Sequence, residues 1–170
     1  MVYFFADPHF GDKNIMKLEN RPFVSVSDMN STIIRNWNKK VNPEDEVFLL
    51  GDIIGAVSIP LIEIKTILDT LQGKITIIAG NHDKGILQDL RDWGYIVSEY
   101  PIIYKEFWIV SHEPVYLNKF SVYGNIFGHV HGNPMYKTVS SRSYCVSAER
   151  VNYTPISFDE IVSKIHLENE

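Results

Sequence analysis

Residues 2–9 read VYFFADPH, an apolar run that ends in a polar turn. The run is rich in aromatic and β-branched side chains and is too short for a helix, so it predicts a buried strand over Val2–Ala6. Similar runs occur at four further places, each followed by polar residues or glycine. They are Glu46–Leu50, Lys74–Ala79, Phe107–Val110 and Asn125–Phe127. We interpret these five runs as the central strands of the fold.

Amphipathic segments separate the first strands and follow the last one. The predicted helices are Ser27–Val41 with Ser27 as its cap, Ile59–Leu71 with Pro60 in its first turn, Lys84–Trp93, and a helix after the capping box Ser157–Glu160. Three short strands in the second half, Tyr95–Val97, Ile102–Tyr104 and Phe107–Val110, are interpreted as hairpins because their spacing is too short for helical crossovers. This order indicates an α/β sandwich with helices outside.

The composition is typical of a globular protein. Apolar residues make up 45% of the 170 positions and charged residues 22%, which excludes disordered, collagen-like and disulfide-rich classes. A chain of this length buries about 70% of its unfolded surface in one core, so we predict one domain over residues 1–170. Sixteen basic against twenty-one acidic residues give a net charge of −5, which disfavours a protein that coats nucleic acid.

Several features favour a cytoplasmic location. The single cysteine, Cys145, has no partner for an internal disulfide. The first residues have neither a basic leader nor a long apolar core, so we expect no secretion signal. The apolar runs are strand-sized and fall short of the ~20 residues of a membrane helix. We therefore expect a protein of the reducing cytoplasm with no membrane partner.

Polar turns with metal-binding side chains follow the predicted strands. They are Asp7-Pro8-His9, Gly51-Asp52, Gly80-Asn81-His82-Asp83, Ser111-His112 and Gly128-His129-Val130-His131. Five of the six histidines lie in these turns, and only His166 lies elsewhere. Ligands bind at the carboxyl ends of strands in open α/β sheets, so we expect these turns to meet in one place.

The donor set in the turns predicts a metal site. Imidazole, carboxylate and amide groups without thiolate suit first-row cations better than Mg, Ca or an iron–sulfur cluster. Two divalent metal ions are needed to use all the donors, and we expect Mn first, with Fe, Zn, Ni or Co as alternatives. Such a pair, ~3.5–4 Å apart, holds an activated hydroxide and neutralises the oxygens of a transferring phosphoryl group. Asp52 is the natural bridging carboxylate.

The polar turns follow a fixed order along the chain: Asp-x-His, Gly-Asp, Gly-Asn-His-Asp, an isolated His and Gly-His-x-His, between residues 7 and 131. In this order they resemble the calcineurin-like metallophosphoesterase family. Further stretches resemble a compact bacterial and phage-type subgroup: Asp7-x-His9-Phe10-Gly11, Asn14-Ile15, Arg21-Pro22-Phe23, Met29-Asn30, Asn36-Trp37-Asn38 and Asn152-Tyr153-x-Pro155. The resemblance implies a four-layer α/β/β/α sandwich of two mixed β-sheets flanked by helices, the metallo-dependent phosphatase fold.

The resemblance also implies roles for individual residues. One metal would be held by Asp7, His9, Asp52 and His131, and the second by Asp52, Asn81, His112 and His129. His82 matches a residue that approaches the leaving-group oxygen, and Asp83 is expected to fix the tautomer of His82. Asn81, His82 and Asp83 are therefore the expected catalytic residues.

Two positions depart from the family pattern. Relatives of the subgroup often carry His where Asp12 stands, and many families of the fold have an acidic residue where Gly55 stands. A carboxylate near the phosphate would repel it, so we expect both departures to affect substrate contacts. Five further residues flank the ligand turns and are candidates for substrate contact, Arg142 first, with surface solvation as the alternative. They are Lys13, Arg21, Tyr116, Tyr123 and Arg142.

Together these observations predict a dinuclear metal-dependent phosphohydrolase in which a metal-bridging hydroxide attacks the phosphoester. The substrate is expected to be a small phosphodiester, a phosphomonoester or a nucleotide, because little chain is left for a nucleic-acid-binding domain and the net charge is negative. One alternative is a nuclease of the same fold, which would have a basic, aromatic-lined groove. Another is a non-catalytic docking module on the same scaffold.

Overall fold

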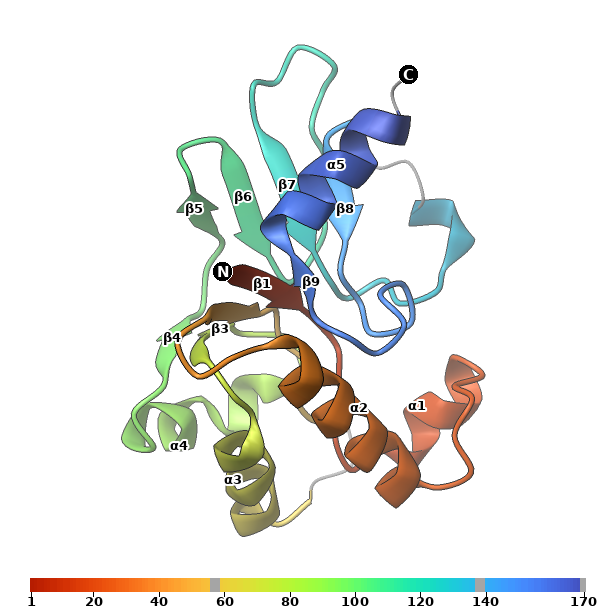
Figure 1. Ribbon diagram of the computed structural model, residues 1–170, viewed down its shortest axis with the longest axis vertical. Helices are drawn as coiled ribbons and strands as arrows, with labels where there is room; N and C mark the ends of the chain where they lie inside the picture. Colours follow the sequence, from red (N-terminus) through yellow and green to blue (C-terminus); the bar gives the residue numbers. More distant parts are fainter. Residues whose placement is uncertain (56–58, 137–139, 169–170) are drawn as a thin grey trace.

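The computed structural model describes residues 1–55, 59–136 and 140–168, in which helices flank two mixed β-sheets (Figure 1). The strands of the first sheet are β1 (Val2–Phe5), β2 (Glu46–Leu49), β3 (Lys74–Ile78), β4 (Ile96–Ser98) and β9 (Ile156–Ser157). They lie in the order β4-β3-β2-β1-β9, with β1 to β4 parallel and β9 antiparallel. The carboxyl ends of β1, β2 and β3 therefore share one edge.

The second sheet packs against the face of the first sheet that carries Phe4. Its strands are β5 (Ile102–Tyr104), β6 (Trp108–Ser111), β7 (Gly124–Phe127) and β8 (Ser143–Cys145), in that order. Strands β5 and β6 form an antiparallel hairpin, whereas β6, β7 and β8 are parallel. Beyond β8, Ser147 forms a parallel bridge with Ala6, which follows β1, and this bridge joins the two sheets.

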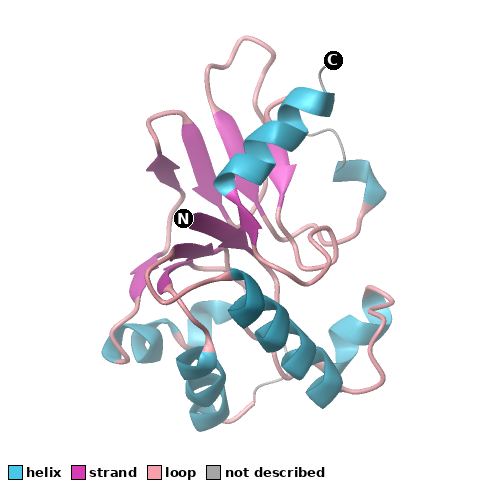
Figure 2. Cartoon of the chain, viewed as in Figure 1, coloured by secondary structure: helices cyan, strands magenta, loops and turns pink. Residues whose placement is uncertain are grey.

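Helices cover the outer faces of both sheets (Figure 2). They are α1 (Lys13–Leu18), α2 (Val26–Lys40), α3 (Leu61–Thr70), α4 (Leu87–Asp92) and α5 (Phe158–Glu168), with short 3₁₀ turns η1 (Asp83–Gly85) and η2 (Pro134–Tyr136). The arrangement confirms the predicted α/β fold with two mixed sheets. Within the described residues, no helix combines the length and the apolar character that crossing a membrane requires.

Strand β1 is buried on both faces, which explains its continuous apolar sequence. Phe5 points toward the helices, where its ring centroid lies 5.8 Å from that of Trp37 in α2. Phe4 points the other way, and its ring centroid lies 5.2 Å from that of Phe48 and 5.7 Å from that of Tyr104 in the second sheet. Alternate side chains of one strand thus hold both the helices and the second sheet in place.

Side-chain caps set the ends of two helices. Helix α2 begins at Val26 because the Ser25 hydroxyl accepts a hydrogen bond from the Asp28 backbone N–H (3.1 Å). The predicted cap, Ser27, was therefore wrong by two positions. The predicted capping box of α5 is confirmed, since the Glu160 N–H donates to the Ser157 hydroxyl (3.2 Å) and the Ser157 N–H donates to the Glu160 carboxylate (2.9 Å).

Two predictions for the second half of the chain were wrong. Strand β4 was expected in a hairpin with its neighbours, but it pairs in parallel with β3 in the first sheet. The predicted hairpin of Ile102–Tyr104 with Phe107–Val110 is confirmed by the antiparallel pairing of β5 and β6. Strands β7 and β8 extend this sheet in parallel rather than in further hairpins, since residues 112–123 and 128–142 are long enough to return the chain to the starting end of the sheet. The predicted helix Lys84–Trp93 divides at Ile86 into η1 and α4.

Candidate metal centre

The predicted ligand turns lie side by side where the two sheets meet. Beyond β1, the Asp7 N–H donates to the Gly51 carbonyl (3.1 Å) and the His9 N–H donates to the Asp52 carbonyl (3.0 Å). The His129 N–H, which follows β7, donates to the Asp7 carboxylate (2.9 Å). Hydrogen bonds thus gather three turns that are far apart in sequence.

Five of the seven predicted metal ligands have a left-handed backbone conformation. They are Asp7 (φ 57°), His9 (φ 51°), Asp52 (φ 49°), His129 (φ 68°) and His131 (φ 47°). Non-glycine residues rarely adopt this conformation, which costs about 1–3 kcal/mol each. Such strain persists only where the surrounding structure holds it, and it clusters at binding and catalytic sites. The strained positions therefore mark this edge as the candidate functional site.

Glycines next to the ligands allow the turns to approach one another closely. A Cβ on Gly51 would lie 2.4 Å from the Gly80 nitrogen, and a Cβ on Gly80 would lie 2.3 Å from Asp52 Oδ1. A Cβ on Gly128 would lie 2.8 Å from Asp7 Oδ2. No side chain fits at these three positions without moving a turn, which explains why glycine precedes these ligands.

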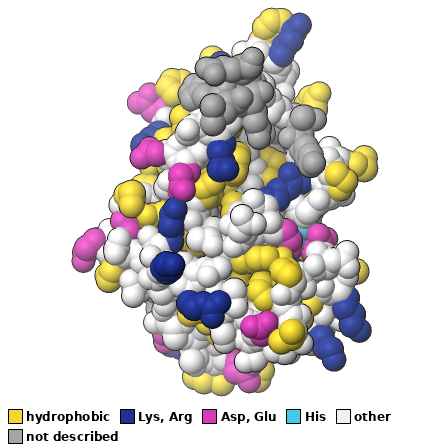
Figure 3. Space-filling model, turned by 45° about the vertical axis from the view of Figure 1, so that its right-hand side comes forward, with side chains coloured by type: hydrophobic (Ala, Val, Ile, Leu, Met, Phe, Trp, Pro, Cys, Tyr) yellow, Lys and Arg dark blue, Asp and Glu magenta, His cyan; other side chains and the backbone are white. Residues whose placement is uncertain are grey.

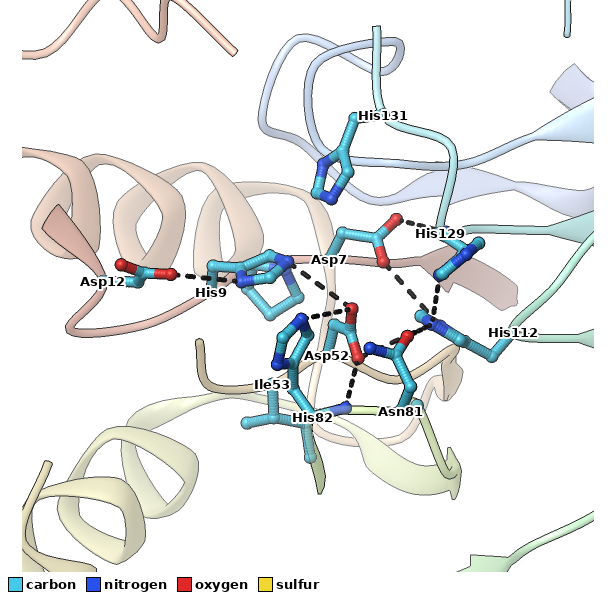
Figure 4. A network of polar contacts seen from close by, with 12 residues as sticks. Asp7, His9, Asp12, Asp52, Ile53, Asn81, His82, His112, His129 and His131 are labelled. Atoms are coloured by element: carbon cyan, nitrogen blue, oxygen red, sulfur yellow. Dashed lines mark hydrogen bonds and ion pairs between the residues drawn. The ribbon is translucent and has the colours of Figure 1, made fainter. Parts of the chain in front are cut away.

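One set of donors consists of Asp7, His9 and His131, whose ligand atoms lie within 4.8 Å of one another (Figure 4). Asp7 and His9 are buried. Asp7 Oδ1 and both ring nitrogens of His9 have no hydrogen-bond partner among the described residues. Buried polar atoms without partners are costly, and a bound cation would satisfy carboxylate and imidazole lone pairs together. The residues of this set therefore fit a metal ion.

A second set consists of Asp52, His112 and His129, also within 4.8 Å of one another. Nε2 of His112 lies 3.1 Å from His129 Nδ1, 3.0 Å from Asn81 Oδ1 and 3.5 Å from Asp52 Oδ1. These atoms converge on one point from different turns (Figure 4). The other oxygen of Asp52, Oδ2, lies 3.6 Å from His9 Nε2 in the first set. Asp52 is thus placed between the two sets.

Acceptor oxygens lie beside Nδ1 of three histidines, at hydrogen-bond distance for His112 and His131 and as a longer ion-pair contact for His9. His112 Nδ1 lies 2.8 Å from the Leu50 carbonyl, and His131 Nδ1 lies 3.2 Å from Glu149 Oε2. His9 Nδ1 lies 3.6 Å from Asp12 Oδ2. An imidazole that donates through Nδ1 keeps the lone pair of Nε2 for a metal, and such oriented partners are usual behind metal-binding histidines.

A buried ion pair behind His131 was missed from the sequence. Nε and NH2 of Arg21 each lie 2.7 Å from Glu149 Oε1, and the guanidinium also donates to the backbone carbonyls of Asp7 and Pro8 (2.8 Å each). The Arg21 side chain is fully buried, so it holds Glu149 rather than reaching substrate as one hypothesis had it. Arg21 lies in the stretch Arg21-Pro22-Phe23, which resembles the family. Glu149 follows β8 in a turn that has no metal-binding motif.

Asp12 and Gly55 act on the site indirectly. Asp12 is buried, caps α1 by accepting from the Asn14 N–H (2.7 Å), and faces His9. A Cβ on Gly55 would lie 1.9 Å from Asp12 Oδ2, so the absence of a side chain at position 55 makes room for this carboxylate. The structure thus places Asp12 behind His9, and the expected effect of the two residues on substrate contacts stays a prediction.

His82 lies at the edge of the cluster, with its side chain 34% exposed and Nε2 4.0 Å from Asp52 Oδ2. Its backbone N–H donates to Asp52 Oδ1 (3.0 Å). Asp83 was expected to contact the His82 ring, but its two carboxylate oxygens accept from the backbone N–H groups of Ile53 and Gly80 (2.9 Å each). Those bonds give Asp83 the role of holding two ligand turns together.

Arg142, the first candidate for substrate contact, lies at the opposite end of the second sheet. It immediately precedes β8, and its guanidinium donates to the carbonyls of Ser121 and Val122 (3.4 and 3.3 Å), which precede β7. The metal-ligand turns follow the carboxyl ends of these parallel strands. Arg142 is therefore not brought to the site.

The surroundings of the cluster shift the pKa values of its donors in different directions. Burial raises the pKa of the Asp7 carboxyl to about 6. Burial, together with the nearby His131, lowers the pKa of His9 to about 2, so this imidazole is neutral at neutral pH. Burial also lowers the pKa of His129. Neutral imidazole is the form that ligates a cation. In the space-filling view, a small area of histidine surface lies between acidic side chains (Figure 3).

The fold and the two donor sets define a metallophosphoesterase. The chain matches the calcineurin-like phosphoesterases over residues 1–164 and belongs to that family. Membership implies a hydrolase that acts on phosphoesters, and the family usually binds divalent metals. An uncharacterized protein of Methanocaldococcus jannaschii is 37% identical over 168 residues, which cover 96% of this chain and 90% of that protein.

Further similarities are more distant. The gene 66 protein of Mycobacterium phage L5 is 28% identical over 104 residues, 61% of this chain and 49% of that protein. A crystal structure of a protein of unknown function from Aquifex aeolicus has a TM-score of 0.76 at 26% identity and covers 96% of this chain and 98% of its own. The Pseudomonas putida nuclease MPE has a TM-score of 0.52 at 20% identity over 76% of this chain and 60% of its own, a likeness of fold alone.

Proposed function

We propose that the protein is a two-metal phosphohydrolase of small phosphoesters or nucleotides. The position of Asp52 carries this proposal, because its two oxygens face His9 (3.6 Å) and His112 (3.5 Å), one in each donor set. A single carboxylate between two groups of imidazoles suits the bridging of two cations. The first cation would be held by Asp7, His9, Asp52 and His131, and the second by Asp52, Asn81, His112 and His129.

Divalent cations at these positions would stabilise charge on the phosphoryl oxygens and supply a nucleophilic water at neutral pH. The chain itself contributes a proton donor for the leaving oxygen. His82 suits this role because its ring is more exposed than those of His9 and His112 and lies at the rim of the cluster. The hydrogen bond from its backbone N–H to Asp52 Oδ1 holds the backbone of His82 beside the donors. An imidazole within hydrogen-bonding reach of a leaving oxygen is an effective general acid.

Imidazole and carboxylate ligands without thiolate suit Mn, Fe, Zn, Ni and Co. Of these we propose Mn as the metal, with Fe, Zn, Ni and Co as alternatives. The proposed location is the reducing cytoplasm, which agrees with a free, buried Cys145.

A nuclease is the second candidate function. It is favoured by the shared fold of the Pseudomonas putida nuclease and by the range of the family, which includes enzymes acting on nucleic acid. A nuclease would cleave single-stranded DNA at a rate that falls steeply with salt concentration. The reason is that positively charged side chains of the protein displace counterions from the DNA phosphates. Hydrolysis of small esters would change little with salt.

The test is hydrolysis of bis(p-nitrophenyl) phosphate and p-nitrophenyl phosphate by chelator-treated protein, with and without added Mn²⁺. We expect activity only with metal. We expect His82→Ala to keep both metals, measured by elemental analysis, and to lose about 10²–10⁴-fold in rate. Two bound metals without hydrolysis of either ester would contradict the proposed substrate class. Absence of bound metal would favour a non-catalytic docking module.

A further inference from the structure

A cavity of about 370 Å³ opens beside the second donor set. It lies between the carboxyl ends of β3 and β6, where residues 99–101 cross from the first sheet to the second. Asn81 and His112 form part of its wall. A group attached to a phosphorus at the metal centre would therefore reach directly into this cavity.

The walls of the cavity are held by hydrogen bonds. The Ser98 hydroxyl donates to the Tyr100 carbonyl (2.7 Å) and accepts from the Tyr100 N–H (3.3 Å), which fixes the turn on one side. On the other side, the Val115 N–H donates to the side chain of Asn125 (2.8 Å), which is fully buried. The cavity is thus formed in advance of any ligand, as most ligand sites are.

Part of the lining is apolar. Ile78 and Leu87 are buried beneath the cavity, and Pro101 and Pro114 line its sides. The Tyr100 side chain is 77% exposed, and its ring is in no aromatic pair among the described residues. An exposed aromatic ring on an apolar floor is suited to stacking against a planar ligand.

The charges of the lining favour a neutral ligand. Glu99 is paired with Arg91 (2.6 Å), so its charge is compensated. Lys84 and Glu113 are the other charged side chains that line the cavity, and their opposite charges balance. A second phosphate would meet two carboxylates and one ammonium, whereas hydroxyl or amino groups would find the Glu113 carboxylate as an acceptor.

We propose that this cavity binds the nucleoside part of a nucleotide ester whose phosphorus lies at the metal centre. The inference rests on the proposed function for the position of the phosphate. The ring of Tyr100 would stack on the base, and Glu113 would accept from hydroxyl groups of the sugar. A volume of about 370 Å³ suits one nucleoside.

Binding of adenosine, which has no phosphate, tests the cavity separately from the reaction. Adenosine is titrated into metal-free protein and followed by NMR chemical shifts. We expect saturable binding that weakens about tenfold or more in Tyr100→Ala and is retained in Tyr100→Phe. Phe120→Ala, at an aromatic residue that is 82% exposed and outside the cavity lining, is the matched control and should bind normally. The same variants loaded with Mn²⁺ are assayed on a nucleoside phosphoester and on methyl phosphate, whose alkyl group cannot stack on an aromatic ring.

The two proposals fail in different ways. Tyr100→Ala should lower kcat/KM for the nucleoside ester about tenfold and leave that for the methyl ester unchanged. No adenosine binding, or equal binding by Tyr100→Ala and Phe120→Ala, would overturn the cavity proposal even if both esters are hydrolysed. Adenosine binding that depends on Tyr100, with no metal-dependent hydrolysis of either ester, would overturn the proposed function and leave the cavity.

Discussion

Glu149→Gln is the substitution that most directly probes how the proposed metal-binding histidine His131 is held. The Arg21 side chain is fully buried and gives Glu149 Oε1 two contacts of 2.7 Å. Removing one partner of a buried ion pair costs about 3–5 kcal/mol, because the other charge stays buried. Arg21 keeps two backbone carbonyl partners, so we expect a loss near the lower end, about 3 kcal/mol in the free energy of unfolding.

The same substitution should weaken metal binding. Glutamine retains an oxygen that can accept from His131 Nδ1, but it loses the charge and the anchoring by Arg21. Loss of such a partner behind a metal-binding histidine lowers affinity about 10–100-fold. The assays are urea unfolding of metal-free protein and calorimetric titration with Mn²⁺. The expected result is a lower urea midpoint together with weaker binding at the set that contains His131.

A surface ion pair provides the control. Glu44 lies 3.1 Å from Lys74 and its side chain is 88% exposed, so Glu44→Gln should change stability by less than about 1 kcal/mol and leave metal binding intact. If Glu149→Gln unfolds at the same urea concentration as Glu44→Gln and binds Mn²⁺ with unchanged affinity, Glu149 does not position His131.

Three further predictions follow from single contacts. Gly55→Ala should lower the free energy of unfolding by about 1–3 kcal/mol and weaken metal binding, because the new methyl group would lie 1.9 Å from Asp12 Oδ2. Unchanged urea unfolding and Mn²⁺ titrations would exclude the role of Gly55 in making room for Asp12. Burial raises the pKa of Glu160, but hydrogen bonds from Ser157 outweigh it and lower this pKa to about 2. The contribution of Glu160 to folding stability is therefore present above its usual pKa of 4.5 and is lost as pH falls toward 2. Since the Glu160 side chain is 45% exposed, Glu160→Gln should lower the free energy of unfolding by only about 1 kcal/mol at pH 7 and not at all at pH 2. Equal losses at both pH values in urea unfolding would refute the stabilising role of the Glu160 carboxylate. Because the pKa of Asp7 is raised to about 6, metal affinity should fall at least about tenfold per pH unit below pH 6, and calorimetry that finds constant affinity between pH 5 and 7 would contradict this.

The sequence predicted those parts of the fold that depend on local pattern. Apolar spacing identified β1 and the buried face of α2, where Met29, Ile33 and Trp37 are fully buried. The capping box at Ser157 and Glu160 was predicted correctly because its hydrogen bonds join residues three positions apart. The sheet to which β4 belongs was not predicted, because pairing between distant strands leaves no mark in the spacing of either strand.

The candidate site was likewise predicted only in part from the sequence. The ligand turns were predicted because donors directly follow strands, as Asp7 and Asp52 do. The supporting contacts were not predicted, because Arg21 lies beside Glu149 only in the folded chain, where the bridge between Ala6 and Ser147 joins the ends of β1 and β8. Charged residues in ordinary turns look alike in sequence, and only the fold distinguishes a buried partner from a solvated one.

In the proposed function one carboxylate, Asp52, serves two metal ions. Elemental analysis of protein reconstituted with Mn²⁺ and freed of excess metal tests it directly, with Asp52→Ala compared against the parent chain. We predict two ions per chain for the parent and loss of occupancy at both positions in Asp52→Ala, because each donor set loses a ligand. Two ions retained in Asp52→Ala, or one ion or none in the parent chain, would contradict the account.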